Sequence, residues 1–164
     1  MKTVYFMRHA KSSWKDGSLT DHERPLNKRG LKDAPLMGKL LKEKGMLPDG
    51  ILVSSARRAQ ETCRLFTEMA DYDPASVHTE EMIYENDYDI LLQLIRQQPD
   101  AWQSLMIIGH NPSTQEAVNA LSDQFFDKIP TAAIAAIQFM VRNWSEVGQN
   151  RGRLLFFEYP KKHK

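Results

Sequence analysis

Residues 3–14 read TVYFMRHAKSSW, a strand-like run that changes abruptly into polar residues. The first part, TVYFM, is rich in β-branched and aromatic residues, which is typical of a β-strand. It ends on a cation and an imidazole, Arg8 and His9, and small or polar residues follow at once. In an open α/β sheet the carboxyl ends of the strands form the edge at which ligands bind, so these two side chains mark a candidate site.

The composition is that of one globular domain. The chain has 164 residues, of which 41% are hydrophobic and 26% charged, both ordinary values for a folded domain. A chain of this length buries roughly two-thirds of its extended surface without disulfide bonds. The net charge is +1, so no global field indicates nucleic acid or an anionic membrane as a partner.

The cysteine content and the absence of long apolar runs favour a location in the cytoplasm. Cys63 is the only cysteine, which excludes an internal disulfide and a paired-cysteine redox or zinc site. No signal-peptide segment follows Met1, and no apolar run approaches the roughly 20 residues that span a bilayer. We therefore expect a cytoplasmic protein that does not associate with membranes. The last four residues, 161–164 (KKHK), form a basic tail that we expect to be a frayed, solubilising end.

Strand-like and helix-like segments alternate through most of the chain. GILVSS (50–55) and LMIIGH (105–110) are short apolar runs typical of strands buried on both faces. The spacing of apolar residues predicts helices over residues 27–44, 56–70, 87–97 and 111–122. Pro35 lies inside the first of these, so either the helix kinks there or its regular part begins near Asp33.

The end of the chain departs from this alternation. Residues 133–141 and 153–159 read as two strands, and the segment between them contains the Gly and Asn residues of a turn. Strand–helix alternation followed by a closing hairpin predicts an α/β fold. Specifically, we expect a single-domain three-layer sandwich with a largely parallel central sheet, an antiparallel edge hairpin and helices on both faces.

The three predicted parallel strands each end on polar residues that this fold would bring to one edge. These residues are Arg8, His9, Ser54, Arg57, Arg58, His110 and Asn111. The planar fork of arginine matches phosphate or carboxylate oxygens, and helix N-termini after Ser55 and Asn111 would add backbone N–H donors. A neutral imidazole is a nucleophile that can accept a phosphoryl group, and the arginines would keep it neutral while stabilising the transferring group.

Four sequence blocks also resemble a known family. They are MRHA with KSSW, DHERPLNKRG, VSSARRAQET and IGHNPS, and they extend in this order from Tyr5 to Ser113. Together they are similar to the motifs of the histidine phosphatase superfamily (phosphoglycerate mutase-like), most of all to its short SixA-type phosphohistidine phosphatases. The resemblance implies a histidine phosphatase-like domain over residues 1–160, followed by the basic tail.

The resemblance assigns roles to individual residues. It implies that His9 is the phosphate-accepting nucleophile, with Arg8, Arg58 and His110 as the other catalytic residues and Arg57 as a more exposed neighbour. It also implies that Arg24, Ser54 and Asn111 contact the substrate. The first motif of the family usually reads Arg-His-Gly, whereas Ala10 stands at the third position here. If that position has a positive φ, alanine costs about 1 kcal/mol.

A carboxylic acid that would protonate a leaving group is harder to identify. The best candidate is Glu85, with Asp87 as second choice. A phosphohistidine substrate needs such an acid less than a phosphate ester does, because imidazole leaves as a neutral group once its other nitrogen is protonated. The chain also has no long insertion that would enclose a small sugar phosphate. Both features favour a phosphohistidine-bearing protein as the substrate.

We therefore predict a phosphatase without cofactor or metal that works through a phosphohistidine at His9. Two alternatives are a small-metabolite phosphomonoesterase of the same superfamily and a non-catalytic phosphate-binding module. A metallohydrolase would need carboxylates or closely spaced histidines, and a serine hydrolase would need glycines around its serine. Individual residues also have simpler roles: Arg24 could pair with Asp21 or Glu23 in an exposed loop, and Trp14 could line the pocket or only pack.

Overall fold

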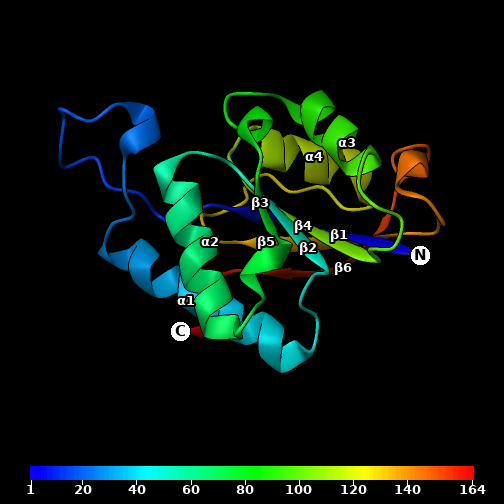
Figure 1. Cartoon of the computed structure of the whole chain (residues 1–164), viewed down its shortest axis with the longest axis horizontal. Coiled ribbons are helices and arrows are strands. Elements are labelled where there is room, and N and C mark those ends of the chain that lie inside the picture. Colours follow the sequence, from blue (N-terminus) through cyan, green and yellow to red (C-terminus); the bar gives the residue numbers. More distant parts are fainter.

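The computed structural model describes residues 1–164 and contains one six-stranded sheet between two layers of helices (Figure 1). In chain order the strands and α-helices are β1 Lys2–Arg8, α1 Lys28–Lys44, β2 Gly50–Val53, α2 Arg57–Ala70, β3 Val77–Thr79, α3 Tyr88–Arg96, β4 Ser104–Gly109, α4 Ser113–Leu121, β5 Ile134–Phe139 and β6 Arg153–Glu158. Five short 3₁₀ helices lie between or after them: η1 Asp21–Glu23, η2 Pro74–Ser76, η3 Glu81–Ile83, η4 Trp144–Glu146 and η5 Pro160–His163.

The strand order confirms the predicted architecture. The sheet runs β3-β2-β4-β1-β5-β6. The pairs β2–β3, β2–β4 and β1–β4 are parallel, whereas β1–β5 and β5–β6 are antiparallel. The last two strands therefore form the antiparallel edge expected from the closing hairpin.

The apolar runs of the strands fill both faces of the sheet. In β1, Val4 and Phe6 point into a core shared with α3 and α4, while Tyr5 and Met7 point into a second core shared with α1 and α2. Successive side chains of a strand point to opposite faces, so a strand covered on both sides is apolar at every position. Figure 1 shows the two helix pairs on opposite sides of the sheet. Cys63 belongs to the second core, where burial raises the pKa of its thiol to about 12.

The helix α1 begins earlier than one of our alternatives placed it. It starts at Lys28, and the side chain of Asn27 accepts a hydrogen bond from the backbone N–H of Gly30, a typical N-cap. Pro35 lies inside the helix, so the prediction of a start near Asp33 is wrong. The C-terminus agrees with the sequence, because Gly45 ends the helix in the left-handed conformation that glycine adopts without strain.

Two further features differ from the expectations. The short edge strand β3 was not predicted, since three residues carry too little pattern to be recognised. The basic tail is not frayed: η5 covers Pro160–His163, Lys162 and His163 pair with Glu158, and the Lys164 ammonium lies 2.8 Å from a carboxylate oxygen of Asp33. None of the helices has the length and hydrophobicity that crossing a bilayer requires.

Replacing Gly38 with alanine should destabilise the fold. Gly38 lies where α1 crosses α2, and a Cβ atom added there would stand 2.3 Å from the carbonyl oxygen of Phe66. Helix propensity alone would favour alanine by about 1 kcal/mol, but forced overpacking costs about 1–3 kcal/mol. We expect the free energy of unfolding in urea to fall by the difference, about 1 kcal/mol.

Gly17→Ala is the matched control for this substitution. A Cβ atom at Gly17 meets no atom within 4 Å, so its effect should stay within about 0.5 kcal/mol. A Gly38→Ala protein as stable as the original would show that the two helices separate without cost.

Candidate active site

The register of three neighbouring strands places the predicted residues at one edge of the sheet. Arg8 pairs with Gly109 in the β1–β4 ladder, and Val53 pairs with Ile108 in the β2–β4 ladder. The residues that follow are His9, His110 and Ser54, and they therefore emerge side by side. The rings of His9 and His110 lie with their centroids 5.1 Å apart.

A pocket of about 220 Å³ opens at this edge. It is lined by Arg8, His9, Lys11, Ser12, Trp14, Arg24, Arg58, His110, Asn111 and Thr131. Six of our eight candidate residues thus share one pocket, the exceptions being Ser54 and Glu85. Its walls carry four cations and no carboxylate, which makes it a site for an anion.

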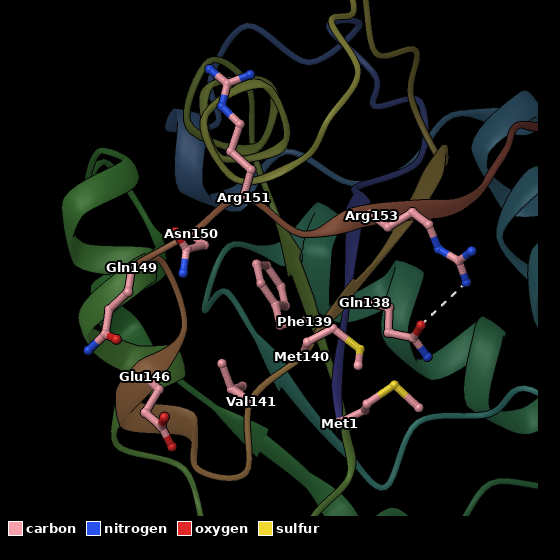
Figure 2. Close-up of a pocket in the computed structure, with 10 residues that line it drawn as sticks. All are labelled: Met1, Gln138, Phe139, Met140, Val141, Glu146, Gln149, Asn150, Arg151 and Arg153. Carbon is pink, nitrogen blue, oxygen red and sulfur yellow. Dashed lines mark hydrogen bonds between the residues drawn. The ribbon is translucent and has the colours of Figure 1, made fainter.

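Figure 2 shows a different and larger hollow, of about 670 Å³. It lies at the other end of the strands, because Met1 precedes β1 and Phe139 is the last residue of β5, which runs antiparallel to β1. No histidine lines it, and a hydrogen bond from Arg153 to Gln138 crosses its rim. The histidines and arginines that we predicted for the site therefore line the smaller pocket and not this hollow.

His9 is held in the tautomer that a nucleophile requires. Its Nδ1 lies 2.7 Å from the carbonyl oxygen of Ala10, and because a carbonyl only accepts, Nδ1 carries the proton. The lone pair is then on Nε2. Burial lowers the pKa of His9 to about 3, and the positive charges of Arg58 and Arg8 act in the same direction. The imidazole is thus neutral at pH 7.

Ala10 does not strain the chain. The non-glycine residues with positive φ are Asp71, Glu85 and Ala132, so the cost considered for alanine in the first motif does not arise. The N–H of Ala10 donates to the hydroxyl of Thr62 at 2.9 Å, and that hydroxyl donates to the carbonyl of Arg58. The backbone beside the nucleophile is therefore attached to helix α2.

Three arginines surround His9, and each is fixed by its own contacts. Arg8 donates from Nη1 to the carbonyl oxygen of Ile129 at 2.9 Å. Arg24 donates to the hydroxyl of Ser12 at 2.8 Å, and its guanidinium lies over the Trp14 ring, 3.4 Å from the centroid. The simpler role considered for Arg24 is partly correct, because it does pair with Asp21. Yet Arg24 is only 7% exposed, so it is a pocket residue and not a surface ion pair.

Asp21 joins two of these arginines, and the sequence did not reveal this role. One carboxylate oxygen lies 3.2 Å from Nη2 of Arg24, and the other lies 3.0 Å from Nη2 of Arg58. The second oxygen also accepts a hydrogen bond from the hydroxyl of Tyr84 at 2.7 Å. The hydrogen bond from Tyr84 and the charge of Arg58 lower the pKa of Asp21 to about 2. Asp21 therefore stays ionised and holds both guanidinium groups.

The second histidine, His110, is supported from behind. Its Nε2 lies 2.7 Å from the hydroxyl oxygen of Ser54, and its Nδ1 is buried without a hydrogen-bond partner. The ring of Tyr84 packs edge-on against it. Burial, followed by the charge of Arg58, lowers the pKa of His110 to about 4.

The structure places Ser54 and Asn111, the two other residues predicted to contact the substrate, differently. Ser54 is completely buried, is not among the residues that line the pocket, and contacts His110, whose ring it positions. Asn111 does line the pocket, but its amide nitrogen donates to the carbonyl of Ile129 and its side-chain oxygen is buried without a partner. Lys11, Ser12 and Thr131 also line the pocket, but the sequence analysis assigned them no role. Lys11 and Ser12 belong to the KSSW block, and all three lie outside the helices and strands.

The carboxylates predicted as general acids lie outside this pocket. Glu85 is exposed and lines a neighbouring hollow of about 390 Å³ that also contacts His110 and Asn111. Asp87 caps helix α3 by accepting a hydrogen bond from the N–H of Asp89. Neither carboxylate lines the pocket that contains His9. The structure also holds no group of three or more His, Cys, Asp or Glu side chains arranged to bind a metal ion.

The two depressed histidine pKa values predict how stability depends on pH. In the unfolded chain both rings titrate near 6.5, whereas in the folded protein the pKa values are about 3 for His9 and about 4 for His110. Below pH 6.5 the unfolded chain therefore binds protons that the folded protein does not, and acidification favours unfolding. We expect urea titrations from pH 7 to pH 5 to show a falling free energy of unfolding, with up to about 1.4 kcal/mol per pH unit from each histidine.

A single substitution isolates the contribution of one ring. In His110→Gln the fall between pH 7 and pH 5 should shrink to roughly half, since one of the two groups is removed. A free energy of unfolding that does not change over this range in the original protein would contradict the buried, neutral state of the two histidines.

The fold and the site together define an α/β protein with an arginine-lined pocket around a neutral histidine. The family model of the histidine phosphatase superfamily (branch 1) matches residues 4–128, and the chain belongs to this family. An uncharacterised chloroplastic protein of Arabidopsis thaliana is 34% identical in an alignment of 154 positions that covers 88% of this chain and 70% of that protein.

Solved structures agree with this assignment. The structure of a protein assigned as phosphohistidine phosphatase SixA from Agrobacterium tumefaciens is similar with a TM-score of 0.81 and 28% identity, over 97% of this chain and 99% of that one. The protein histidine phosphatase SixA in complex with tungstate has the same fold, with a TM-score of 0.84, 21% identity and 99% of each chain covered.

Proposed function

We propose that the protein is a phosphatase that removes phosphoryl groups from phosphohistidine on a protein, through a covalent intermediate at His9. The observation that carries this proposal is the state of His9: a neutral ring with its proton on Nδ1 and its lone pair on Nε2, inside a pocket lined by arginines. A neutral imidazole in a cationic pocket combines a nucleophile with the charges that bind its target.

Buried donors around the pocket support a phosphoryl group as its ligand. Nε of Arg8 and Nε of Arg58 are buried and have no hydrogen-bond partner in the protein. Nδ1 of His110 is also buried without a partner, and it is a donor in the tautomer whose Nε2 accepts from the hydroxyl of Ser54. Leaving a buried donor unpaired costs about 1–3 kcal/mol, and more for a charged group. Phosphoryl oxygens that accept from these residues would remove that cost, and arginine is the side chain best suited to them.

The first chemical step transfers the phosphoryl group to His9. Nε2 attacks phosphorus, a N–P bond forms, and the bond from phosphorus to the substrate nitrogen breaks. The proton stays on Nδ1, from which it is donated in a hydrogen bond to the Ala10 carbonyl. Arg8, Arg24 and Arg58 stabilise the charge on the equatorial oxygens, and His110 donates to one of them.

The second step returns the enzyme to its starting state. Water attacks the phosphorus, the N–P bond to His9 breaks, and the proton lost by water leaves with the product phosphate or solvent. Because Nδ1 has kept its proton, His9 departs as a neutral imidazole. The same hydrogen bond to Ala10 therefore makes His9 a good nucleophile in the first step and a good leaving group in the second.

The absence of a carboxylate from the pocket walls supports phosphohistidine as the substrate. An alkoxide leaving group needs a proton in the transition state, and no acid lines the pocket to supply it. The imidazole of a phosphohistidine leaves neutral when its other nitrogen is protonated. The similarity to the Agrobacterium tumefaciens protein, at 28% identity over almost the whole chain, supports the same substrate class. A cytoplasmic location stays a prediction from the sequence.

Phosphate release from two substrates tests this function. A histidine-phosphorylated protein and glycerol 3-phosphate, an alkyl ester whose leaving group needs a proton, are supplied side by side, with EDTA present. We expect faster release from the phosphohistidine protein, and the same rate with and without EDTA. A preference for the small ester would replace the proposal with a metabolite phosphatase that recruits Glu85, and loss of activity in EDTA would refute the metal-free mechanism. Phosphate binding without release from either substrate would indicate a binding module.

A further inference from the structure

A second hollow adjoins the catalytic pocket and is larger, at about 720 Å³. The two share Thr131, which lines both. The hydroxyl of Thr131 accepts a hydrogen bond from Nη2 of Arg29 at 3.1 Å, so the wall between pocket and hollow is itself cationic. We call this hollow the basic groove.

The groove carries a local excess of positive charge. Its charged residues are Arg29, Asp33, Lys128, Lys161 and Lys164. The carboxylate of Asp33 is fully buried and already pairs with Lys164 at 2.8 Å and with Arg29 at 3.5 Å. Lys128 and Lys161 are exposed and pair with no carboxylate. The chain as a whole has a net charge of only +1, so this excess is a feature of one surface.

We propose that the basic groove docks an acidic segment of the phosphoprotein whose phosphohistidine enters the catalytic pocket. This inference rests on the proposed function, and it narrows the substrates to phosphohistidines with Asp or Glu residues nearby. Charge complementarity identifies the occupant, because carboxylates on a partner would meet the two free lysines as the phosphoryl group meets the arginines.

The shape of the groove favours a peptide segment over a second phosphate group. Phe157, Tyr159, Pro130 and Pro160 supply apolar and aromatic surface along it, which packs against side-chain and backbone atoms of a chain. A phosphate site would need convergent donors, as in the catalytic pocket, whereas the free cations here are two separate lysines on flexible stems. Its volume is also about that of a small-molecule site, several times that of one phosphate.

Labelled histidine peptides test the proposal. One peptide has Glu residues on both sides of the histidine, the other has Gln in their place, and each is used with and without chemical phosphorylation of the histidine. Dissociation constants are measured by fluorescence anisotropy on the His9→Ala protein, which prevents turnover. We expect the Glu peptide to bind more tightly than the Gln peptide in both phosphorylation states. The difference should shrink in about 0.5 M salt, because exposed charge pairs are screened.

Charge reversal locates the binding surface. Lys128→Glu and Lys161→Glu, each added to the His9→Ala protein, should reduce the preference for the Glu peptide by about fivefold. Arg142→Glu is the matched control, because this substitution changes the net charge by the same amount. Arg142 is exposed, has no ion pair, and follows β5 at the end of the strands opposite the catalytic pocket. The preference should persist in this variant.

The outcomes separate the groove from the catalytic proposal. Equal binding of the Glu and Gln peptides, or equal effects of Arg142→Glu and the two lysine reversals, would overturn the groove proposal whatever the enzyme hydrolyses. Affinity for inorganic tripolyphosphate that depends on Lys128 and Lys161, without a preference for the Glu peptide, would assign the groove to a second phosphate and overturn it as well. Failure of the original protein to release phosphate from either phosphorylated peptide, with the Glu preference intact, would count only against the proposed function.

Discussion

Replacing His9 with alanine should reduce phosphate release from a phosphohistidine protein by about four orders of magnitude or more, as removal of a covalent nucleophile does in other enzymes. Nε2 of His9 carries the lone pair of a ring that is neutral at pH 7, whereas Nε2 of the other neutral ring, His110, is engaged by the hydroxyl of Ser54. No carboxylate lines the pocket to take over its role. The measurement is single-turnover phosphate release at pH 7 with excess enzyme, which isolates the chemical steps.

The same variant should keep its fold and its affinity for the anion. The arginine contacts do not involve the ring of His9, so inorganic phosphate should still bind in calorimetry. His78→Ala is the matched control, because His78 lies in the edge strand β3 and stacks on Trp102, away from the pocket. Turnover by His9→Ala within tenfold of the original protein would refute a covalent intermediate at His9.

Replacing Arg58 with methionine should lower kcat/KM by about 10²–10³-fold, the usual effect of removing one charged donor from a transition-state site. Arg58 is 6% exposed, lines the pocket and is fixed by Asp21 through two hydrogen bonds. Methionine keeps most of the volume of the arginine stem but supplies no donor. The positive charge of Arg58 also helps to lower the pKa values of His9 and His110, so both pKa values should rise in the Arg58→Met protein.

The next residue in the chain provides the control. Arg57 begins the same helix but is exposed, and it pairs with Glu61 on the surface. Arg57→Met should change kcat/KM by less than about twofold, since exposed ion pairs contribute little. Equal effects of the two substitutions would mean that Arg58 acts through general electrostatics and not through contact with the phosphoryl group.

Much of the fold was predictable because its signals are local. A strand covered on both faces is apolar at every position, as in β1 and β4, and a helix covered on one face repeats its apolar residues with helical spacing. The pocket cations and histidines were predictable for a related reason. Arg8, His9 and His110 directly follow the ends of parallel strands, and in such a sheet those ends meet at one edge.

The positions predicted less well depend on contacts between distant segments. Glu85 lies in a loop whose path the sequence does not specify, and the structure places it beside a neighbouring hollow. Ser54 follows β2 as expected. Its complete burial behind His110, a residue 56 positions later in the sequence, depends on how the strands β2 and β4 pack side by side. The short strand β3 forms only because β2 is available as its partner.

The sequence by itself thus determined the layers of the fold, the edge that holds the site and the arginine–histidine chemistry of that edge, since each follows from residues adjacent in the chain. Only the tertiary structure decided the state of the site. Asp21 contacts Arg58, which lies 37 residues away in the sequence, and Tyr84, which lies 63 residues away. In the basic groove, Lys128 lies on the same surface as Lys161 from the C-terminal end of the chain. Such contacts form when packed layers bring distant segments together, and burial in those layers also lowers the pKa of His9 to about 3.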